Sequence, residues 1–249
     1  MGNHKVAIVT GGSQGLGFEI VQNFLNAGYK VLTCARRENA KLNSIPNLDF
    51  IKGDICVPDT HTNLINKAMS IYGNLNVYVN NAGLSSWRPI EKIEPDFLNK
   101  LFATNIYSAF WGCKAASKYL KTNDSIINIS SIAGKRGSKN NSAYVATKFA
   151  MNGLTQSLSK ELGEKGIRVN AVCPVLVKTD GLISALKEKD APGYPNPDNF
   201  IEKFKSSQSA LGRLPTSKEV AEFVLFLASN NASAITGQCI NIDCGVFPQ

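Results

Sequence analysis

Tyr144 and Lys148 combine two side chains that can handle a proton. They lie four positions apart at the start of a long stretch with helical periodicity, and residues i and i+4 share one face of a helix. The phenol and the ammonium group can therefore serve one cavity. Ser131 lies thirteen residues before Tyr144 and directly follows a predicted strand, and doubly wound sheets bind ligands at the carboxyl ends of their strands. Asn105 lies in a further helical stretch and is the fourth candidate.

A glycine-rich stretch between the first predicted strand and the first predicted helix is a candidate phosphate site. Missing side chains let backbone N–H groups approach a pyrophosphate at the positive end of the helix. A simple tight turn would also need glycine, but the strand-loop-helix context favours a dinucleotide. A P-loop is excluded because no Lys-Ser or Lys-Thr pair follows. The residues predicted to contact the cofactor here are Gly11, Ser13, Gln14, Gly15, Leu16 and Gly17.

The end of the second predicted strand bears on the choice of dinucleotide. Sites selective for NAD place an Asp or Glu there, which accepts a hydrogen bond from the ribose 2′-hydroxyl. This chain has Ala35 at that position, followed by Arg36 and Arg37. Guanidinium groups recognise phosphate through a planar fork of donors, although two solvated arginines at a strand end would look the same. The missing carboxylate favours NADP(H), with NAD(H) as the second choice.

Short apolar strands alternate with helix-length stretches along the chain, which predicts βαβ units and a parallel sheet covered on both faces. Right-handed crossovers make this a doubly wound α/β fold, a Rossmann fold of about seven strands in three layers. We expect a single catalytic domain over residues 1–249. The predicted strands are Val6–Thr10, Lys30–Ala35, Asp49–Gly53, Leu75–Asn80, Ser125–Ser130, Arg168–Val172 and Gln238–Ile242. The predicted helices are Leu16–Ala27, Thr62–Tyr72, Asp96–Leu120, Ala143–Gly163 and Ser217–Ser229.

Composition narrows the class of protein. The 249 residues are 43% hydrophobic, enough to bury one core without disulfides or a structural metal. The six cysteines form no CxxC pair, which indicates reduced thiols in a cytoplasmic protein, and no metal site is expected. No run of about 18 apolar residues predicts a membrane span. The charge of +8 is dispersed, which favours attraction of anionic small molecules over nucleic-acid binding.

Taken together, these motifs closely resemble the short-chain dehydrogenase/reductase family, in its subfamily of about 250 residues. The resemblance covers nearly the whole chain, and the order and spacing of the motifs make it specific. The matching positions are the loop Thr10–Gly17, Asp54, Asn80-Asn81-Ala82-Gly83, Asn105, Ser131, Tyr144, Lys148, Pro174, Thr179, Thr236-Gly237 and Asp243-Cys244-Gly245.

The resemblance implies a role for each candidate catalytic residue. Tyr144 would be the general acid/base, and Ser131 would donate a hydrogen bond to the substrate oxygen. Asn105 would hold a water in a proton relay, while Lys148 would bind the nicotinamide ribose and lower the pKa of the tyrosine. Two groups about 4 Å apart at an effective dielectric of about 20 interact by roughly 4 kcal/mol, which would bring a phenol pKa toward 7. Ser130 is the alternative to Ser131, but alternation along the strand predicts that it faces the other way.

The family pattern also implies cofactor contacts outside the glycine loop, and this chain departs from the pattern at two points. Val175 follows Pro174 where the family usually has glycine, so we expect a shifted or crowded backbone there. Cys244 replaces a glycine near the end of the chain, with an expected effect on subunit packing. The implied contacts are Asp54, Ile55, Asn81, Ala82, Gly83, Tyr144, Lys148, Pro174, Val177 and Thr179.

From Lys178 to about Gly212 the alternation of strands and helices stops, and residues 191–198 are rich in turn formers. Such an excursion favours a substrate-binding loop or lid at about 180–212. Three functions stay open: reduction of a ketone or 3-oxoacyl group with NADPH, oxidation of a polyol, sugar or other secondary alcohol, and a non-catalytic dinucleotide-binding protein. The complete catalytic set argues against the third. The family resemblance also implies a homotetramer or homodimer.

Overall fold

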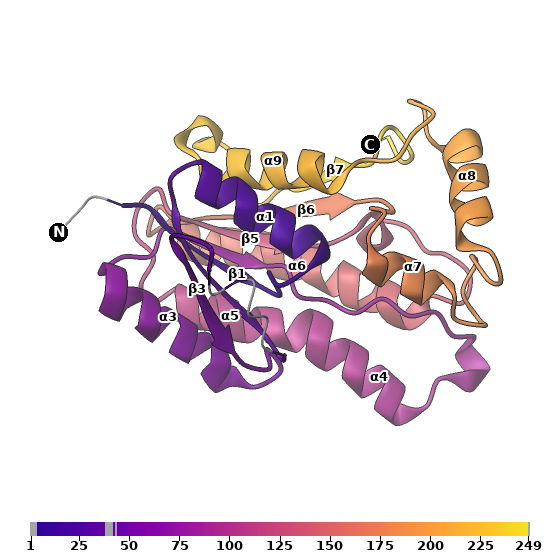
Figure 1. Ribbon diagram of the computed structural model, residues 1–249, viewed down its shortest axis with the longest axis horizontal. Helices are drawn as coiled ribbons and strands as arrows, with labels where there is room; N and C mark the ends of the chain where they lie inside the picture. The colour runs from indigo at the N-terminus through magenta and orange to yellow at the C-terminus, as the bar shows by residue number, and fades with distance from the viewer. Residues whose placement is uncertain (1–3, 38–41, 43, 249) are drawn as a thin grey trace.

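The computed structural model describes residues 4–37, 42 and 44–248 (Figure 1). Within these ranges, seven strands form one parallel sheet in the order β3-β2-β1-β4-β5-β6-β7. The direction of strand addition reverses between β1 and β4. The predicted doubly wound sheet is confirmed, and its strand ends lie within two residues of the predicted ones. The strands are β1 (Val6–Thr10), β2 (Lys30–Ala35), β3 (Leu48–Lys52), β4 (Val77–Asn80), β5 (Ser125–Ile129), β6 (Arg168–Pro174) and β7 (Cys239–Ile242).

Helices cover both faces of the sheet because the strands are apolar on both. In β1, Ala7 and Val9 pack in one core with α1 (Gly15–Asn26) and α9 (Ser217–Ala228). Val6 and Ile8 point into the opposite core, against α3 (Pro58–Tyr72) and α5 (Ser108–Ala116). Figure 1 shows α1 and α9 on one side of the sheet and α3 and α5 on the other. No helix of the described residues is long and apolar enough to cross a membrane.

The single helix predicted over Asp96–Leu120 is wrong. The structure has α4 (Pro95–Phe102), a π-helical turn at Ala103–Tyr107 and then α5, which ends at Ala116. A π turn adds one residue to a helical turn, and such turns are frequent at functional sites. Asn105 lies within this turn, where its amide exchanges hydrogen bonds with the backbone of Leu84. Side-chain periodicity alone cannot reveal an inserted residue of this kind.

The segment after β6 is also more regular than predicted. It contains α7 (Asp180–Leu186) and α8 (Pro197–Gln208), which lie together beyond the end of the sheet (Figure 1). Leu186 and Ile201 of these helices pack with Trp87 in a separate hydrophobic cluster. Of the turn-forming residues at 191–198, the first six lie between the two helices, and Pro197 and Asp198 form the start of α8. The remaining long helix, α6 (Ser142–Gly163), begins one residue before its predicted start and carries Tyr144 and Lys148 in its first turns.

Candidate active site

A cleft of about 340 Å³ opens at the carboxyl ends of β1 to β4, where the strand order reverses. This is the position at which doubly wound sheets bind their ligands. Its lining comes from the glycine loop, the ends of β2 and β3, the loop after β4 and the start of α7. The lining residues are Gly11, Ser13, Gln14, Gly15, Leu16, Gly17, Cys34, Ala35, Arg36, Gly53, Asp54, Ile55, Cys56, Asn81, Ala82, Gly83, Thr104, Thr179, Asp180 and Gly181.

The glycine loop is shaped by close backbone packing. Gly11 and Gly15 have φ of +69° and +55°, a region that L side chains rarely adopt. A Cβ on Gly17 would lie 2.3 Å from the Gly11 carbonyl oxygen, so no side chain fits there. Gly12, which was not among the predicted contacts, is equally restricted, because a Cβ there would lie 2.4 Å from Oγ1 of Thr33. The same Thr33 hydroxyl accepts a hydrogen bond from the Gly12 N–H and ties the loop to β2.

The loop after β3 forms one wall of the cleft. Asp54 folds the loop by accepting a hydrogen bond from the Cys56 N–H at 2.9 Å. The carbonyl of Ile55 lies 2.8 Å from Nε2 of His61 on α3. His61 also contacts the hydroxyl of Tyr78 at 2.7 Å, and burial lowers its pKa. The neutral ring therefore donates to Ile55 and accepts from Tyr78. Sequence reasoning missed Cys56 and His61, because neither belongs to a motif.

The three residues proposed to choose the dinucleotide differ in position. Ala35 and Arg36 line the cleft, whereas Arg37 is exposed and lies outside the lining. No carboxylate follows β2 at the place where an NAD-selective site would have one. The predicted contacts Tyr144, Lys148, Pro174 and Val177 also lie outside the lining of the cleft. The buried side chain of Val177 packs in the core beneath α1 and α9.

Asn105 lies between the cleft and the candidate catalytic residues and is almost fully buried. Its Oδ1 accepts from the Leu84 N–H at 2.7 Å, while Nδ2 donates to the Leu84 carbonyl at 2.8 Å and to Thr147 Oγ1 at 3.2 Å. A Cβ on Gly83 would lie 3.4 Å from Asn105 Oδ1 and 3.9 Å from Lys148 Nζ. The cleft and the catalytic candidates therefore meet at Gly83.

Ser131 and Ser130 face in different directions, as the strand alternation predicts. Ser131 caps a short 3₁₀ turn at Ile132–Gly134 by accepting from the Ala133 N–H at 3.1 Å. Its hydroxyl also donates to the carbonyl of Pro174 at 3.4 Å and is hydrogen-bonded to Tyr144. Ser130 is buried and donates instead to the Lys148 backbone carbonyl. Of the two serines, Ser131 is the one beside the phenol.

Tyr144 and Lys148 lie together, but their pKa shifts differ from the expectation. Burial raises the pKa of Tyr144 to about 12, and the hydrogen bond with Ser131 opposes this shift. Burial also lowers the pKa of Lys148 to about 8. Lys148 Nζ lies 5.6 Å from the centre of the phenol ring and donates to the Ile129 carbonyl at 2.8 Å. The predicted lowering of the tyrosine pKa is wrong for this structure, because desolvation of the phenol outweighs the hydrogen bond with Ser131.

The residues after β6 reach back over the glycine loop. Thr179 caps α7 by accepting from the Leu182 N–H, and its side chain lies 3.6 Å from a Cβ placed on Gly15. Val175 was expected to crowd the backbone here. Its side chain instead points into a small core with Ile132 and Val246. The valine therefore packs away from the cleft.

A second cavity of about 440 Å³ lies next to Leu84, one residue beyond the cofactor cleft. Residues 188–190, which follow α7, form one wall and are held to the opposite loop by polar contacts. Ser86 donates to Glu188 at 2.5 Å, and Lys92 pairs with Asp190 at 3.3 Å. The cavity is lined by Leu84, Ser86, Trp87, Arg88, Phe97, Lys100, Glu188, Lys189 and Asp190.

Comparison with known proteins accounts for this arrangement. The family model described as enoyl-(acyl carrier protein) reductase matches residues 11–247. The chain is 36% identical to a diacetyl reductase [(S)-acetoin forming] of Staphylococcus aureus, over 99% of both chains. It is 34% identical to a 3-oxoacyl-[acyl-carrier-protein] reductase of Chlamydia muridarum, over 98% of this chain and 97% of that protein.

Solved structures agree with the sequence relatives. The aldohexose dehydrogenase of Thermoplasma acidophilum superposes with a TM-score of 0.87 at 32% identity, over 98% of this chain and 94% of that one. A glucose/ribitol dehydrogenase of Brucella melitensis superposes with a TM-score of 0.88 at 28% identity, over 99% and 98% of the two chains. The chain therefore belongs to the short-chain dehydrogenase/reductase family of oxidoreductases, whose members bind an NAD(P)(H) dinucleotide.

Proposed function

We propose that this protein is an NADP(H)-dependent oxidoreductase that interconverts a carbonyl group and a secondary alcohol. The observation that carries the proposal is the meeting of the dinucleotide cleft with Asn105 and Lys148 at Gly83. Ser131 and Tyr144 lie beside Lys148 and are hydrogen-bonded to each other. A bound nicotinamide dinucleotide supplies or accepts the hydride.

The shifted pKa values support the reductive direction. Because burial raises the pKa of Tyr144 to about 12, the phenol is protonated at neutral pH and can donate to a carbonyl oxygen that gains negative charge. Ser131 shares that oxygen as a second donor. Lys148, held by the Ile129 carbonyl, keeps a positive charge below about pH 8 and stabilises the phenolate left behind. Oxidation of a polyol, sugar or other secondary alcohol would use the same residues in reverse, with an initially deprotonated phenol.

The main role of Asn105 is to hold the neighbouring backbone and side chains of the site in place. Its amide hydrogens bond to Leu84 and Thr147, and its oxygen accepts from Leu84. This leaves one lone pair of Oδ1 for the water of the proposed proton relay. Asn105 therefore holds the loop after β4 and offers a single acceptor to that water.

NADP(H) is the proposed dinucleotide, because Arg36 lines the cleft and Ala35 replaces the carboxylate that would repel a 2′-phosphate. The glycine loop fits a pyrophosphate, since Gly17 has no room for a Cβ against the Gly11 carbonyl. Asp54 and Ile55 would flank the adenine, and Thr179 would contact the carboxamide. NAD(H) binding stays the weaker alternative.

The substrate is a small carbonyl compound that enters beside residues 188–190. Reduction of a ketone or 3-oxoacyl group is the preferred reaction, because two of the relatives are named for diketone or 3-oxoacyl reduction. The polyol or sugar alternative is supported by the structural relatives named for aldohexose and glucose/ribitol. Residues 180–212 serve as the lid of this cavity within a single catalytic domain.

Exposed apolar side chains support a homo-oligomer. Tyr107 and Phe110 project from the π turn and α5, and Phe149 projects from α6, each with about half of its surface exposed. Large exposed apolar side chains on packed helices are typical of protein–protein contacts. We propose that copies of this chain associate through α5 and α6 as a dimer or tetramer in the cytoplasm. Light scattering would measure the mass of the assembly.

Absorbance at 340 nm tests the function directly. NADPH and NADH are each offered with a panel of diketones, 3-oxoacyl thioesters and aldoses, and NADP⁺ with the matching alcohols. We expect turnover of a carbonyl with NADPH, and a rise in the NADPH KM of Arg36→Ala that exceeds its rise for NADH. Equal effects on both dinucleotides would overturn the cofactor assignment. If no pair of dinucleotide and substrate shows turnover, the protein is better explained as a non-catalytic dinucleotide-binding protein.

A further inference from the structure

Lys52 at the carboxyl end of β3 lies beside the place proposed for the 2′-phosphate. It is the register partner of Ala35 at the end of β2. The next residue, Gly53, donates its N–H to the Ala35 carbonyl at 3.0 Å and lines the cleft. Neighbouring strands are about 4.8 Å apart. Lys52 therefore starts one strand spacing from the residue that replaces the usual carboxylate.

The side chains of Ala35 and Lys52 point to the same face of the sheet. Val31 of β2 and Phe50 of β3 pack in the core beneath α1, whereas Cys34 and Ile51 pack in the opposite core. Since side chains alternate along a strand, Ala35 shares the face of Val31 and Lys52 shares that of Phe50. This is the face on which α1 starts, directly after the glycine loop.

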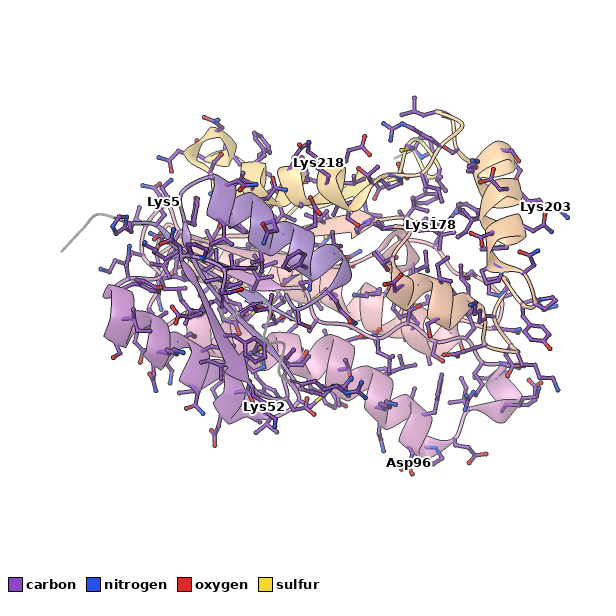
Figure 2. All side chains as sticks on the ribbon, viewed as in Figure 1. Lys5, Lys52, Asp96, Lys178, Lys203 and Lys218 are labelled. Carbon is purple, nitrogen blue, oxygen red and sulfur yellow. The ribbon has the colours of Figure 1, made fainter. Side chains whose placement is uncertain are left out.

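Lys52 is exposed at the end of an edge strand, as Figure 2 shows. In the described part of the chain it takes part in no ion pair, while Lys67 pairs with Asp49 on the other face of β3. Its flexible stem lets the ammonium reach toward Arg36, which lines the cleft. The two basic side chains would then approach a phosphate from adjacent strands.

We infer that Lys52 is a specificity-determining residue that binds the 2′-phosphate of NADP(H) together with Arg36. The inference rests on the proposed preference for NADP(H). Arg36 supplies a planar fork of donors, and Lys52 supplies a mobile point charge. The 2′-hydroxyl of NAD(H) carries no charge, so Lys52 contributes little to the binding of that dinucleotide.

Direct binding measurements test this role. The Kd values of NADPH and NADH are measured by fluorescence titration at one ionic strength for the wild type and for Lys52→Met, Lys52→Arg, Arg36→Ala and Lys5→Met. Lys5 is the matched control, because it is an exposed lysine that precedes β1 at the opposite, amino end of the strands (Figure 2). We expect Lys52→Met to raise the NADPH Kd about fivefold, the upper range for an exposed charge pair. The NADH Kd stays unchanged, and Lys52→Arg retains NADPH binding.

These measurements distinguish failure of the role proposed for Lys52 from failure of the proposed preference for NADP(H). If Lys52→Met and Lys5→Met weaken NADPH equally, only net charge matters and the inference is overturned. If Arg36→Ala weakens NADPH selectively while Lys52→Met has no effect, the inference fails but the cofactor preference stands. If the wild type binds both dinucleotides equally and Arg36→Ala acts equally on both, the cofactor preference itself fails, and the role of Lys52 with it.

Discussion

The proposed cofactor cleft is bounded mainly by backbone, while the proposed substrate cavity is bounded by large side chains. At the cleft, Gly11, Gly15 and Gly17 occupy positions where a side chain would be strained or would clash. Across Leu84, the second cavity is lined by Trp87 and other bulky or charged groups from three separate segments. A backbone-lined site tolerates little change in residue type, whereas a side-chain-lined site can change its ligand without changing the fold.

The proposed catalytic residues lie between these two regions and share features of both. Ser131 is held by backbone contacts to Ala133 and Pro174, so its position follows from the strand end. On α6, Lys148 is buried and Tyr144 is partly buried. Desolvation shifts both pKa values so that the neutral forms are favoured. The fold therefore determines where these side chains lie, while local desolvation determines their pKa values.

The largest effect is expected from Tyr144→Phe, which removes the proton donor and little else. We expect kcat for carbonyl reduction to fall by about 10²–10⁴-fold, the usual contribution of general acid catalysis. The Kd of NADPH should change less than about twofold, because Tyr144 does not line the cleft. Tyr107→Phe, on an exposed tyrosine, is the matched control. Retention of most turnover by the Tyr144 variant would remove the phenol from the mechanism.

The next effect concerns stability at Lys148, whose buried charge is unfavourable to folding. A pKa lowered from 10.5 to about 8 corresponds to about 3 kcal/mol of desolvation at neutral pH. Lys148→Met removes this penalty and also the bond to the Ile129 carbonyl, worth about 1 kcal/mol. We expect the variant to gain about 2 kcal/mol in free energy of unfolding at pH 7, measured in urea.

The pH dependence gives the sign of this effect. Between about pH 8 and 10.5 the folded state binds fewer protons at Lys148 than the unfolded state, so the free-energy penalty of burying Lys148 falls as pH rises. The advantage of Lys148→Met should therefore shrink from pH 7 to pH 9.5. An advantage that stays constant over this range would show that packing, and not the charge, is responsible.

The sequence predicts the residues of the cleft better than it predicts the helices and side-chain contacts around the cleft. Gly17 and Asn81 occur at fixed distances after strands, and strands are readable from apolar runs. The π turn at Asn105 was missed because it inserts one residue without changing the residue types. His61 was missed because its partners, Ile55 and Tyr78, come from other elements.

The pKa of Tyr144 was predicted in the wrong direction for a related reason. The spacing of Tyr144 and Lys148 indicates an electrostatic attraction, whereas the desolvation of the phenol depends on tertiary packing. The two helices in residues 180–212 were missed because the prolines and glycine at 191–198 indicate turns. The apolar residues on either side, Leu186 and Ile201, were therefore not recognised as helical positions. In each case the missing information was a contact between distant parts of the chain.

On the substrate side, Glu188→Ala tests whether residues 188–190 belong to the substrate site. The variant leaves the buried Ser86 hydroxyl without its acceptor, and a hydrogen bond to a charged group at this partly exposed place contributes about 1 kcal/mol. We expect the KM of the carbonyl substrate to rise about fivefold with the Kd of NADPH unchanged. Asp198→Ala, which breaks only an exposed pair with Lys178, is the control and should change neither. A larger change in NADPH binding than in KM would place residues 188–190 with the cofactor cleft instead.

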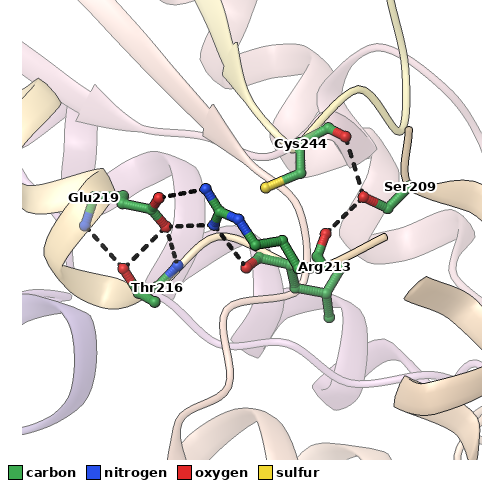
Figure 3. A network of polar contacts seen from close by, with 6 residues as sticks. Ser209, Arg213, Thr216, Glu219 and Cys244 are labelled. Carbon is green, nitrogen blue, oxygen red and sulfur yellow. Dashed lines mark hydrogen bonds and ion pairs between the residues drawn. The ribbon is translucent and has the colours of Figure 1, made fainter. Parts of the chain in front are cut away.

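The smallest effect is expected at Cys244, in the network that ties α8 to the end of the chain (Figure 3). Cys244 has φ of +55°, and its carbonyl accepts from the Leu211 N–H and the Ser209 hydroxyl. A side chain in this region costs roughly 1–2 kcal/mol, and glycine avoids the strain at an entropic cost of about 0.5–1 kcal/mol.

Cys244→Gly should therefore raise the free energy of unfolding by about 0.5–1 kcal/mol, measured by urea denaturation. Cys244→Ala keeps the Cβ and the strain, so it should show no such gain. The next residue behaves in the opposite way, because a Cβ on Gly245 would lie 2.6 Å from the Cβ of Ala210. Gly245→Ala is thus expected to destabilise the protein. Equal gains for the glycine and alanine variants of Cys244 would mean that the partly buried thiol, and not the backbone angle, destabilises the folded state.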